Sequence, residues 1–483
     1  MNPNLFDDAR ADRSEYEAVR SIRALVPFVC PLILLVLCTP PGLRAQVVPV
    51  VPRHVEPYSV DSGLFDGPDE GETIAFQHVV ASPGAPWLRL HIADHYLGAG
   101  SYLTFTSLTD GASQPLDARM IEHWFNASAI FFGDSVLVEL HVAGGDRGVF
   151  FRIEEILVGE EATGEDGIAS ICGASDNRTA SSDGRSGRLF FGGCSAWLAS
   201  NGTVLSAGHC VDFDPDDTPA GCGPQLPDGI LDLTGVFEAN VPTSFANGTT
   251  RPAAPEDQYP INLNSVVWNF DGGCQGLGKD FSVFTVGPNA NTGLRAHMAE
   301  GFFRMTREAP AINNTIRVTG HGSDAGTANF TNQTHTGPYQ GEVFQNATDI
   351  SHTYQVDTTG GNSGSPVIWN TNGVAIGIHT NAGCNADGSG ANSGTSFEHN
   401  PLEAALDNFY DADTVHVDGG MPALGPAENG TVFRPYNTVL EGVTAVPTGG
   451  IVIIVEGSYP GETMTINRAM TLMAPVGTVT IGN

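Results

Sequence analysis

The sequence predicts an all-β protein, and three observations carry this prediction. Strand-like runs recur along the chain, separated by turn-forming Gly, Asn and Pro residues. Between residues 46 and 165 no run keeps a helical period over ten residues. The central part of the chain ends in one helix-like stretch, residues 401–409. With 483 residues, 41% of them hydrophobic, the chain can form two or three domains with real cores.

An amino-terminal leader precedes the part of the chain that is expected to fold. Arg20 and Arg23 lie before an apolar run, residues 24–38, that two prolines interrupt. The small residue Ala45 then offers a cleavage point for signal peptidase. We therefore expect residues 1–45 to contain a signal peptide. The mature protein should be secreted, without stable insertion into a membrane.

The first folded unit is expected over residues 46–165. Its strand-like runs are separated by turn residues, which predicts a β-sandwich-like domain. The runs cover residues 87–92, 102–107, 136–142 and 149–158. No two of its histidines have metal-ligand spacing. Its role stays open among a pro-domain, a carbohydrate-binding or adhesion module, and a folding aid.

A serine in a glycine-flanked turn is the most informative feature of the central part. The stretch G-N-S-G-S-P, residues 361–366, can expose the hydroxyl of Ser363 and direct backbone N–H groups to one point. Such a geometry is typical of an activated nucleophile with an oxyanion hole, and it predicts acyl transfer. Because the same residue types also form ordinary turns, the prediction needs a base and a carboxylate elsewhere.

Candidates for both partners lie upstream of the serine. His209 follows a short apolar run, and Asp280 opens the alternating run 281–286. A serine hydroxyl is a poor nucleophile near neutral pH and needs a histidine base that a carboxylate orients. The chain order His, Asp, Ser is one of three known orders of such triads. We expect His321 and His335 to be surface or turn residues rather than alternative bases.

The cysteines indicate disulfides. Eight occur in the chain, and removal of the leader with its two cysteines leaves an even number in an exported protein. No Cys-x-x-Cys spacing supports zinc, so we expect no metal and no other cofactor. The expected disulfides are Cys194–Cys210 across a hairpin beside His209, Cys222–Cys274 within an acidic insertion, and Cys172–Cys384 by elimination.

Three blocks of sequence occur in a fixed order. They are S-A-G-H-C (206–210) with its upstream cysteine, D-F-S-V-F (280–284), and D-T-T-G-G-N-S-G-S-P-V (357–367) followed by A-I-G-I-H (375–379). Together they resemble the chymotrypsin-like (trypsin-like) serine endopeptidases, and within them the bacterial glutamyl endopeptidase branch. The resemblance spans about residues 170 to 410 and implies a chymotrypsin-like double β-barrel.

The resemblance also assigns roles to single residues. His209 would be the general base and then acid, Asp280 its orienting carboxylate, and Ser363 the nucleophile. The backbone N–H groups of Gly361 and Ser363 would form the oxyanion hole. The protein would then be a serine endopeptidase that acts on proteins or peptides through an acyl-enzyme.

One position departs from the animal members of that family. In the expected trypsin-like serine protease domain, residues 166–415, Asn362 precedes the nucleophile. Most animal members have an aspartate there, which pairs with the new amino terminus released by zymogen cleavage. Activation by such an ion pair is therefore not expected, and the asparagine matches the glutamyl endopeptidase branch.

Two interpretations of the preference at P1, the residue before the cut bond, stay open. Asp357 stands where trypsin-like members carry the aspartate that binds an Arg or Lys side chain of the substrate. Thr358 and His379 match positions that bind a Glu side chain in glutamyl endopeptidases, and we favour this acidic P1. Asp357 could instead hydrogen-bond the backbone and never meet substrate. The non-enzyme alternative is an inactive pseudoprotease that acts as a surface binding protein.

The tail, residues 416–483, changes character again. Its glycine-punctuated strand-like runs resemble rungs of a right-handed parallel β-helix, at residues 451–457, 464–466, 470–473 and 476–481. Roughly three or more repeats are needed to bury a continuous solenoid core. We therefore expect the tail either to dock on the protease domain or to belong to a longer chain.

The charge balance narrows the partners. The net charge is −33, and Lys279 is the single lysine. Such an acidic surface disfavours nucleic acid and anionic membranes as partners. It is typical of an extracellular protein that stays soluble through its charge. The oligomeric state stays open.

Overall fold

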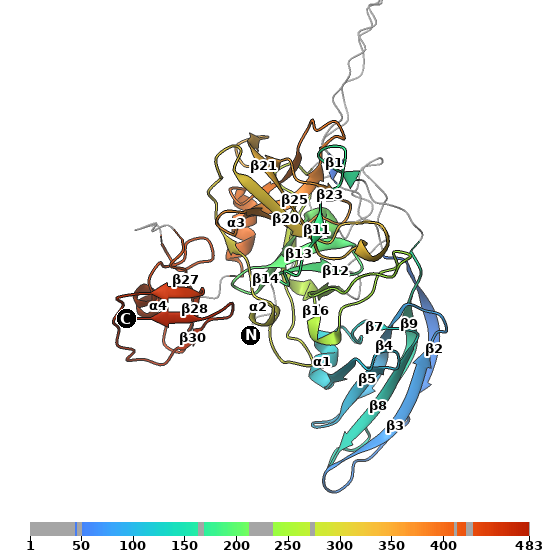
Figure 1. Cartoon of the computed structure of the whole chain (residues 1–483). Helices are drawn as coiled ribbons and strands as arrows, with labels where there is room; N and C mark the ends of the chain where they lie inside the picture. Colours follow the sequence, from blue (N-terminus) through green and yellow to red (C-terminus); the bar gives the residue numbers. More distant parts are fainter. Residues whose placement is uncertain are drawn as a thin grey trace, which may run out of the picture. The chain divides into compact units, whose positions relative to one another are not determined.

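The computed structural model describes residues 44–45, 51–162, 169–211, 235–270, 276–409, 413–421 and 428–482. Strands dominate these residues, and the helices among them are few and short (Figure 1). The predicted all-β class is confirmed. Over the described ranges, no helix has the length and apolar character that a membrane span requires.

Two antiparallel sheets of four strands form the amino-terminal part. One has the order β2 (Arg53–Asp61), β9 (Phe150–Gly159), β4 (Trp87–Tyr96) and β7 (Phe131–Phe132); the other has the order β3 (Glu72–Ala81), β8 (Ser135–Ala143), β5 (Tyr102–Ser107) and β6 (Ser113–Leu116). Buried and half-buried residues alternate along β8, and side chains from both sheets share one hydrophobic core. The predicted β-sandwich is therefore confirmed.

The four expected runs of this sandwich are found as β4, β5, β8 and β9. The sequence did not predict β2 and β3, whose side chains are mostly half-buried or exposed, so that they lack a clear apolar pattern. A short helix, α1 (Ala118–His123), begins at the capping residue Asp117, whose side chain accepts a hydrogen bond from the N–H of Met120.

The core of the sandwich continues into the next part of the chain. Phe190 and Phe191 follow β12 (Ser186–Leu189) and join this core, and the ring of Phe190 meets that of Trp87 edge-on at 5.1 Å. The side-chain amide of Gln258 accepts from the N–H of Ile130 at 2.9 Å and donates to its carbonyl at 2.8 Å. Apolar and polar contacts therefore both connect the sandwich to the sheet that contains β12.

Two curled sheets form the central part. The first has the order β16 (Gln258–Pro260), β15 (Val236–Glu238), β12, β13 (Cys194–Leu198), β14 (Thr203–Ser206), β18 (Phe281–Thr285) and β17 (Val267–Asn269). The second sheet has the order β25 (Val374–Ala382), β24 (Pro366–Trp369), β20 (Thr315–Gly320), β21 (Gln333–Phe344), β22 (Ile350–Tyr354) and β26 (Asn392–Ser396). Pairing of β25 with β26 closes this second sheet into a barrel. Among the described residues the end strands β16 and β17 of the first sheet do not pair, so this sheet forms a half-barrel. A half-barrel and a closed barrel, here called the first and the second barrel, confirm the expected chymotrypsin-like double barrel.

Short strands complete the second sheet. The two-residue strand β1 (Arg44–Ala45) lies antiparallel to the end of β25, and β11 (Thr179–Ala180) lies antiparallel to β21. β19 (Arg304–Met305) runs parallel to β25. The helix α3 (Asn400–Asp407) occupies the helix-like stretch that the sequence predicted, and buries Leu402, Ala405 and Leu406.

The tail contains two small parallel sheets. One joins β27 (Thr414–Val417), β28 (Ile451–Ile454) and β30 (Thr471–Met473), and the other joins β29 (Gly457–Tyr459) and β31 (Val479–Ile481). The β-helix-like prediction is confirmed, although residues 464–466 form no strand. Ile453 packs into the core of the first barrel, and Arg304 pairs with Asp418 at 3.1 Å. The tail therefore contacts the barrels.

Two of the three predicted disulfides are present. They join Cys194 with Cys210 and Cys172 with Cys384. Cys222 and Cys274, for which a third disulfide was predicted, lie outside the described residues.

Candidate active site

The paired ends of two strands bring His209 and Asp280 together. β14 and β18 run antiparallel with Ser206 opposite Ser282, so the chain leaves one strand beside the point where it enters the other. Nδ1 of His209 lies 2.6 Å from Oδ2 of Asp280. A Cβ atom on Gly208 would lie 2.2 Å from the carbonyl oxygen of Asn269, so only glycine fits before the histidine.

The carboxylate of Asp280 is fully buried and already held by the backbone. Its Oδ1 accepts hydrogen bonds from the N–H groups of Gly208 at 2.6 Å and His209 at 3.1 Å. Because a carboxylate can only accept, Nδ1 of the neutral imidazole carries the proton, and Nε2 is the basic nitrogen. This tautomer is the one that a general base needs.

The turn around Ser363 is fastened to the first barrel. The N–H of Ser195 donates to the carbonyl oxygen of Ser363 at 2.9 Å, and the hydroxyl of Ser195 donates to that of Gly361 at 2.8 Å. Gly364 has φ +89°, and a Cβ atom there would lie 2.3 Å from Oγ of Ser206 and 3.1 Å from the nitrogen of Ala207. The turn therefore lies directly against the residues that precede His209.

The two atoms that a proton transfer would use are buried. Oγ of Ser363 and Nε2 of His209 have no hydrogen-bond partner among the residues that the structure describes. The expected hydrogen bond between them is thus not formed here, which is common before substrate binds. Gly361 has φ +97°, a conformation that favours glycine.

Comparisons with known proteins agree with this geometry. Residues 194–378 match the family model of the trypsin-like peptidase domain. The chain contains a trypsin-like peptidase domain. A search of curated proteins found no match to the chain.

Solved protease structures show partial similarity. The protease Anisep from Arthrobacter nicotinovorans is 15% identical, with a TM-score of 0.34, and the match covers 48% of this chain and 98% of that one. A thermostable serine protease, AL20 from an extremophilic microorganism, is 13% identical, with a TM-score of 0.33, over 47% of this chain and 96% of its own.

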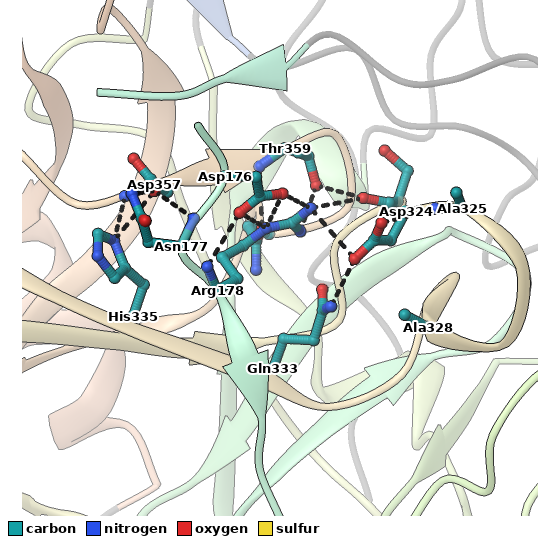
Figure 2. A network of polar contacts seen from close by, with 12 residues as sticks. Asp176, Asn177, Arg178, Asp324, Ala325, Ala328, Gln333, His335, Asp357 and Thr359 are labelled. Atoms are coloured by element: carbon teal, nitrogen blue, oxygen red, sulfur yellow. Dashed lines mark hydrogen bonds and ion pairs between the residues drawn. The ribbon is translucent and has the colours of Figure 1, made fainter. Parts of the chain in front are cut away.

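Asp357 of this peptidase domain faces the backbone of an upstream segment. Its Oδ1 accepts from the N–H of Cys172 at 2.7 Å, and its Oδ2 accepts from the N–H of Asn177 at 2.8 Å (Figure 2). The side chain of Asn177 adds a third hydrogen bond at 3.2 Å. Both oxygens are therefore used inside the protein, as one of the interpretations of the sequence anticipated.

Thr358 and His379 are both fully buried. Oγ1 of Thr358 accepts from the side-chain amide of Asn392 at 2.9 Å, and Nδ1 of His379 lies 2.7 Å from the hydroxyl of Tyr354. The pKa of His379 is lowered to about 3. Burial is the larger cause, and the positive charge that His209 can carry is the smaller one. The imidazole of His379 is consequently neutral at neutral pH.

The structure corrects the expectation for the two other histidines. His321 is fully buried rather than at the surface, and burial lowers its pKa to about 3. His335 lies in β21, and its Nδ1 accepts from the N–H of Asp357 at 2.8 Å. Both had been expected to be surface or turn residues because their sequence neighbours are Gly, Asn and Thr, but His321 is enclosed and His335 is a half-buried strand residue.

A cluster of two cysteines with His209 has the composition of a metal site but cannot bind a metal ion while the cysteines are oxidised. The Sγ atoms of Cys194 and Cys210 and a ring nitrogen of His209 lie within 4.8 Å of one another. The two sulfur atoms form a disulfide, however, so neither is a thiolate.

Three residues of the site had no signal in the sequence. Ser195 follows a predicted disulfide cysteine, Tyr354 lies in an ordinary strand, and Arg178 lies in a polar stretch that reads as a loop. The contacts of all three join segments far apart in the sequence. Only the folded structure reveals them.

Proposed function

We propose that the protein is a secreted serine endopeptidase that uses His209, Asp280 and Ser363 as a catalytic triad. The 2.6 Å contact between Nδ1 of His209 and the buried Asp280 carries this proposal. It fixes the basic nitrogen as Nε2. The glycine-rich turn that carries Ser363 lies against Ser206 and Ala207, which precede this histidine.

The mechanism follows from these positions. Oγ of Ser363 attacks the carbonyl carbon of the substrate while its proton passes to Nε2 of His209, and Asp280 stabilises the resulting imidazolium. The N–H groups of Gly361 and Ser363 bind the negative oxygen. The imidazolium then gives its proton to the leaving amine, which leaves an acyl-enzyme. Water, deprotonated by His209, hydrolyses that ester and regenerates the serine.

Secretion is supported by the disulfides. Two disulfides in the described residues fit an oxidising compartment, because cytosolic thiols are normally kept reduced. The basic and apolar leader before Ala45 has the composition of an export signal.

We further propose a preference for Glu at P1. The carboxylate of Asp357 is occupied by hydrogen bonds to residues 172–177, which weakens the case for a basic P1. His379 lies close enough to His209 for a positive charge on His209 to lower its pKa. The hydroxyl of Tyr354 lies 2.7 Å from Nδ1 of His379 and fixes the orientation of this neutral ring, which occupies the position of the histidine that binds Glu in glutamyl endopeptidases.

A fluorophosphonate probe tests the proposed function. Mass spectrometry of the labelled protein should place the label on Ser363, and the Ser363→Ala variant should lose roughly 10⁴-fold or more of its peptidase turnover. Ser351→Ala is the matched control, because Ser351 is also buried with a hydroxyl that is unpartnered among the described residues. A label on another serine, or full activity of Ser363→Ala, would refute the triad, and a folded protein without any labelling would be a pseudoprotease.

A further inference from the structure

A segment upstream of the first barrel lies along the turn that carries the nucleophile. β10 (Ala169–Ser170) pairs antiparallel with β23 (Thr358–Thr359), which immediately precedes that turn. The disulfide between Cys172 and Cys384 ties the same segment to the chain that follows β25. We call residues 169–178 the clamp segment, and residues 357–365 the nucleophile loop.

One end of the contact is held by a carboxylate of the nucleophile loop. Asp357 accepts hydrogen bonds from two backbone N–H groups of the clamp segment, those of Cys172 and Asn177. The carboxylate is fully buried. Because a buried charge is costly unless it is fully hydrogen-bonded, the position of Asp357 depends on the clamp segment.

The other end is held by a cation of the clamp segment. The side chain of Arg178 is only 3% exposed and pairs with Asp176, with Nη2 of the arginine 2.6 Å from Oδ2. Its Nη1 donates to Oγ1 of Thr359 at 2.7 Å (Figure 2). Its Nη2 donates to the carbonyl oxygen of Ser323 at 3.0 Å. Asp324 lies 3.7 Å from the same nitrogen. The guanidinium therefore joins three segments.

Thr359 connects Arg178 to Asn362, the residue before the nucleophile, through hydrogen bonds. Its N–H donates to Oδ1 of Asn362 at 3.0 Å, and its carbonyl accepts from the N–H of Asn362 at 3.0 Å. There is no room for rearrangement beside them, since a Cβ atom on Gly322 would lie 2.3 Å from both Oδ1 of Asn362 and Oγ1 of Thr359, and 2.6 Å from Nη1 of Arg178. One hydrogen-bonded path thus runs from Arg178 to the neighbour of Ser363.

We propose that Arg178 is a positioning residue that holds the nucleophile loop in its catalytic shape in the uncut chain. The inference rests on the proposed function and adds its regulation: no newly cut amino terminus is needed for activity. A terminal ammonium would find a neutral amide at Asn362, whose oxygen Thr359 already occupies. The guanidinium is a cation that the continuous chain supplies itself.

The first experiment tests independence from cleavage. A recognition site for a specific protease is inserted between Ala162 and Ala169, upstream of the clamp segment, and fluorophosphonate labelling rates are measured before and after cutting. We expect the uncut protein to be labelled and cutting to leave the rate constant unchanged. Labelling only after the cut would overturn the proposal while the proposed function stands. Absence of labelling in both forms would refute the proposed function, and the proposal with it.

The second experiment tests the arginine. Arg178→Gln should lower the labelling rate constant and kcat by about 10²-fold, since small displacements of reacting groups have effects of that size, with KM little changed. Arg178→Lys should recover part of the loss, because it restores the charge without the planar fork. Hydrogen exchange of the amides at 360–363 should speed up in Arg178→Gln, which reports the loop independently of activity.

Arg185→Gln is the matched control. Arg185 pairs with Asp183, two residues before it, at 2.7 Å, just as Arg178 pairs with Asp176, but its guanidinium stacks on Phe303. We expect this variant to react like the wild type. Thr359→Val removes the acceptor of Arg178 without leaving a charge unpaired, and serves if Arg178→Gln does not fold. Wild-type labelling and exchange rates in folded Arg178→Gln or Thr359→Val would overturn the proposal.

Discussion

Asp280 holds His209 at two places at once. One oxygen of the carboxylate contacts Nδ1 of the ring at 2.6 Å, and the other accepts from the backbone N–H of the same histidine at 3.1 Å. The ring and its main chain are therefore fixed by a single buried group. Orientation and tautomer of the proposed base are set before any substrate arrives.

Replacement of Asp280 by asparagine should therefore damage catalysis more than stability. The amide keeps the size of the side chain, but its NH₂ group can point at Nδ1 and force the proton onto Nε2, the wrong tautomer for a base. We expect kcat to fall on the order of 10⁴-fold. Steady-state kinetics on a peptide substrate measure this loss. Asp387→Asn, at an exposed carboxylate bonded to Ser389, is the control and should keep its activity.

The disulfide beside the base should stabilise both the fold and the site. Cys194 and Cys210 are 16 residues apart, and the closed loop contains β13 and β14. Removing the bond in Cys194→Ala/Cys210→Ala should lower the free energy of unfolding by about 3 kcal/mol. It should also lower kcat, because Cys210 directly follows His209. Urea unfolding of the variant in an inactive Ser363→Ala background avoids self-digestion, and an unchanged midpoint would contradict the prediction.

The proposed triad could be predicted from the sequence because its members lie in short contiguous motifs. Each motif combines a reactive residue with the small residues that its backbone geometry needs, such as Gly208 before His209 and Gly364 after Ser363. The disulfide Cys194–Cys210 was also predicted, from two cysteines that flank a short hairpin beside His209, whereas Cys172–Cys384 was predicted only by elimination.

The clamp could not be predicted in this way. The pair Asp176 and Arg178 has the spacing of an ordinary surface ion pair, and only the packing of the second barrel buries the arginine. His321 similarly lies among small polar residues that suggest a turn, yet its backbone N–H donates to Oγ of Ser195 inside the protein. Burial at these positions results from contacts between distant segments, which local patterns do not encode.

Buried histidines should make the fold sensitive to acid. Burial lowers the pKa of His352 to about 4, and those of His321 and His379 to about 3. In the unfolded chain these groups titrate near about 6.5. Below that pH the unfolded state binds more protons than the folded state, so the free energy of unfolding falls as the pH drops toward the folded pKa values, and it is fully present above about 6.5.

His352 gives a specific test of this pH dependence. Its Nδ1 lies 2.7 Å from the hydroxyl of Tyr339 and its Nε2 lies 2.9 Å from the carbonyl oxygen of Ile376, so the neutral ring satisfies both partners. His352→Gln should reduce the loss of stability between pH 7 and pH 5 by about 1 kcal/mol per pH unit at most. Urea midpoints at both pH values measure it, and an identical slope in the two proteins would argue against a neutral His352.

Asp357 should not determine the P1 preference. Because its oxygens bond to Cys172 and Asn177, Asp357→Asn should destabilise the nucleophile loop and slow cleavage of all substrates alike. The ratio of kcat/KM between peptides with Arg and Leu at P1 should stay as in the wild type. A selective loss of cleavage after Arg would instead show that the carboxylate meets the substrate, and would support the basic P1.

The hydroxyl of Tyr354 should matter for cleavage after Glu. It lies 2.7 Å from Nδ1 of His379 and so fixes the orientation of the neutral ring that we propose to bind the Glu side chain. Tyr354→Phe removes this bond and loosens the ring, so kcat/KM for Glu at P1 should fall roughly five- to tenfold, the worth of one hydrogen bond. Peptides with Leu at P1 are the internal control, because they have no carboxylate to bind. An equal loss for Glu and Leu would make the effect one of packing, and a wild-type preference for Leu would remove His379 and Thr358 from the specificity pocket.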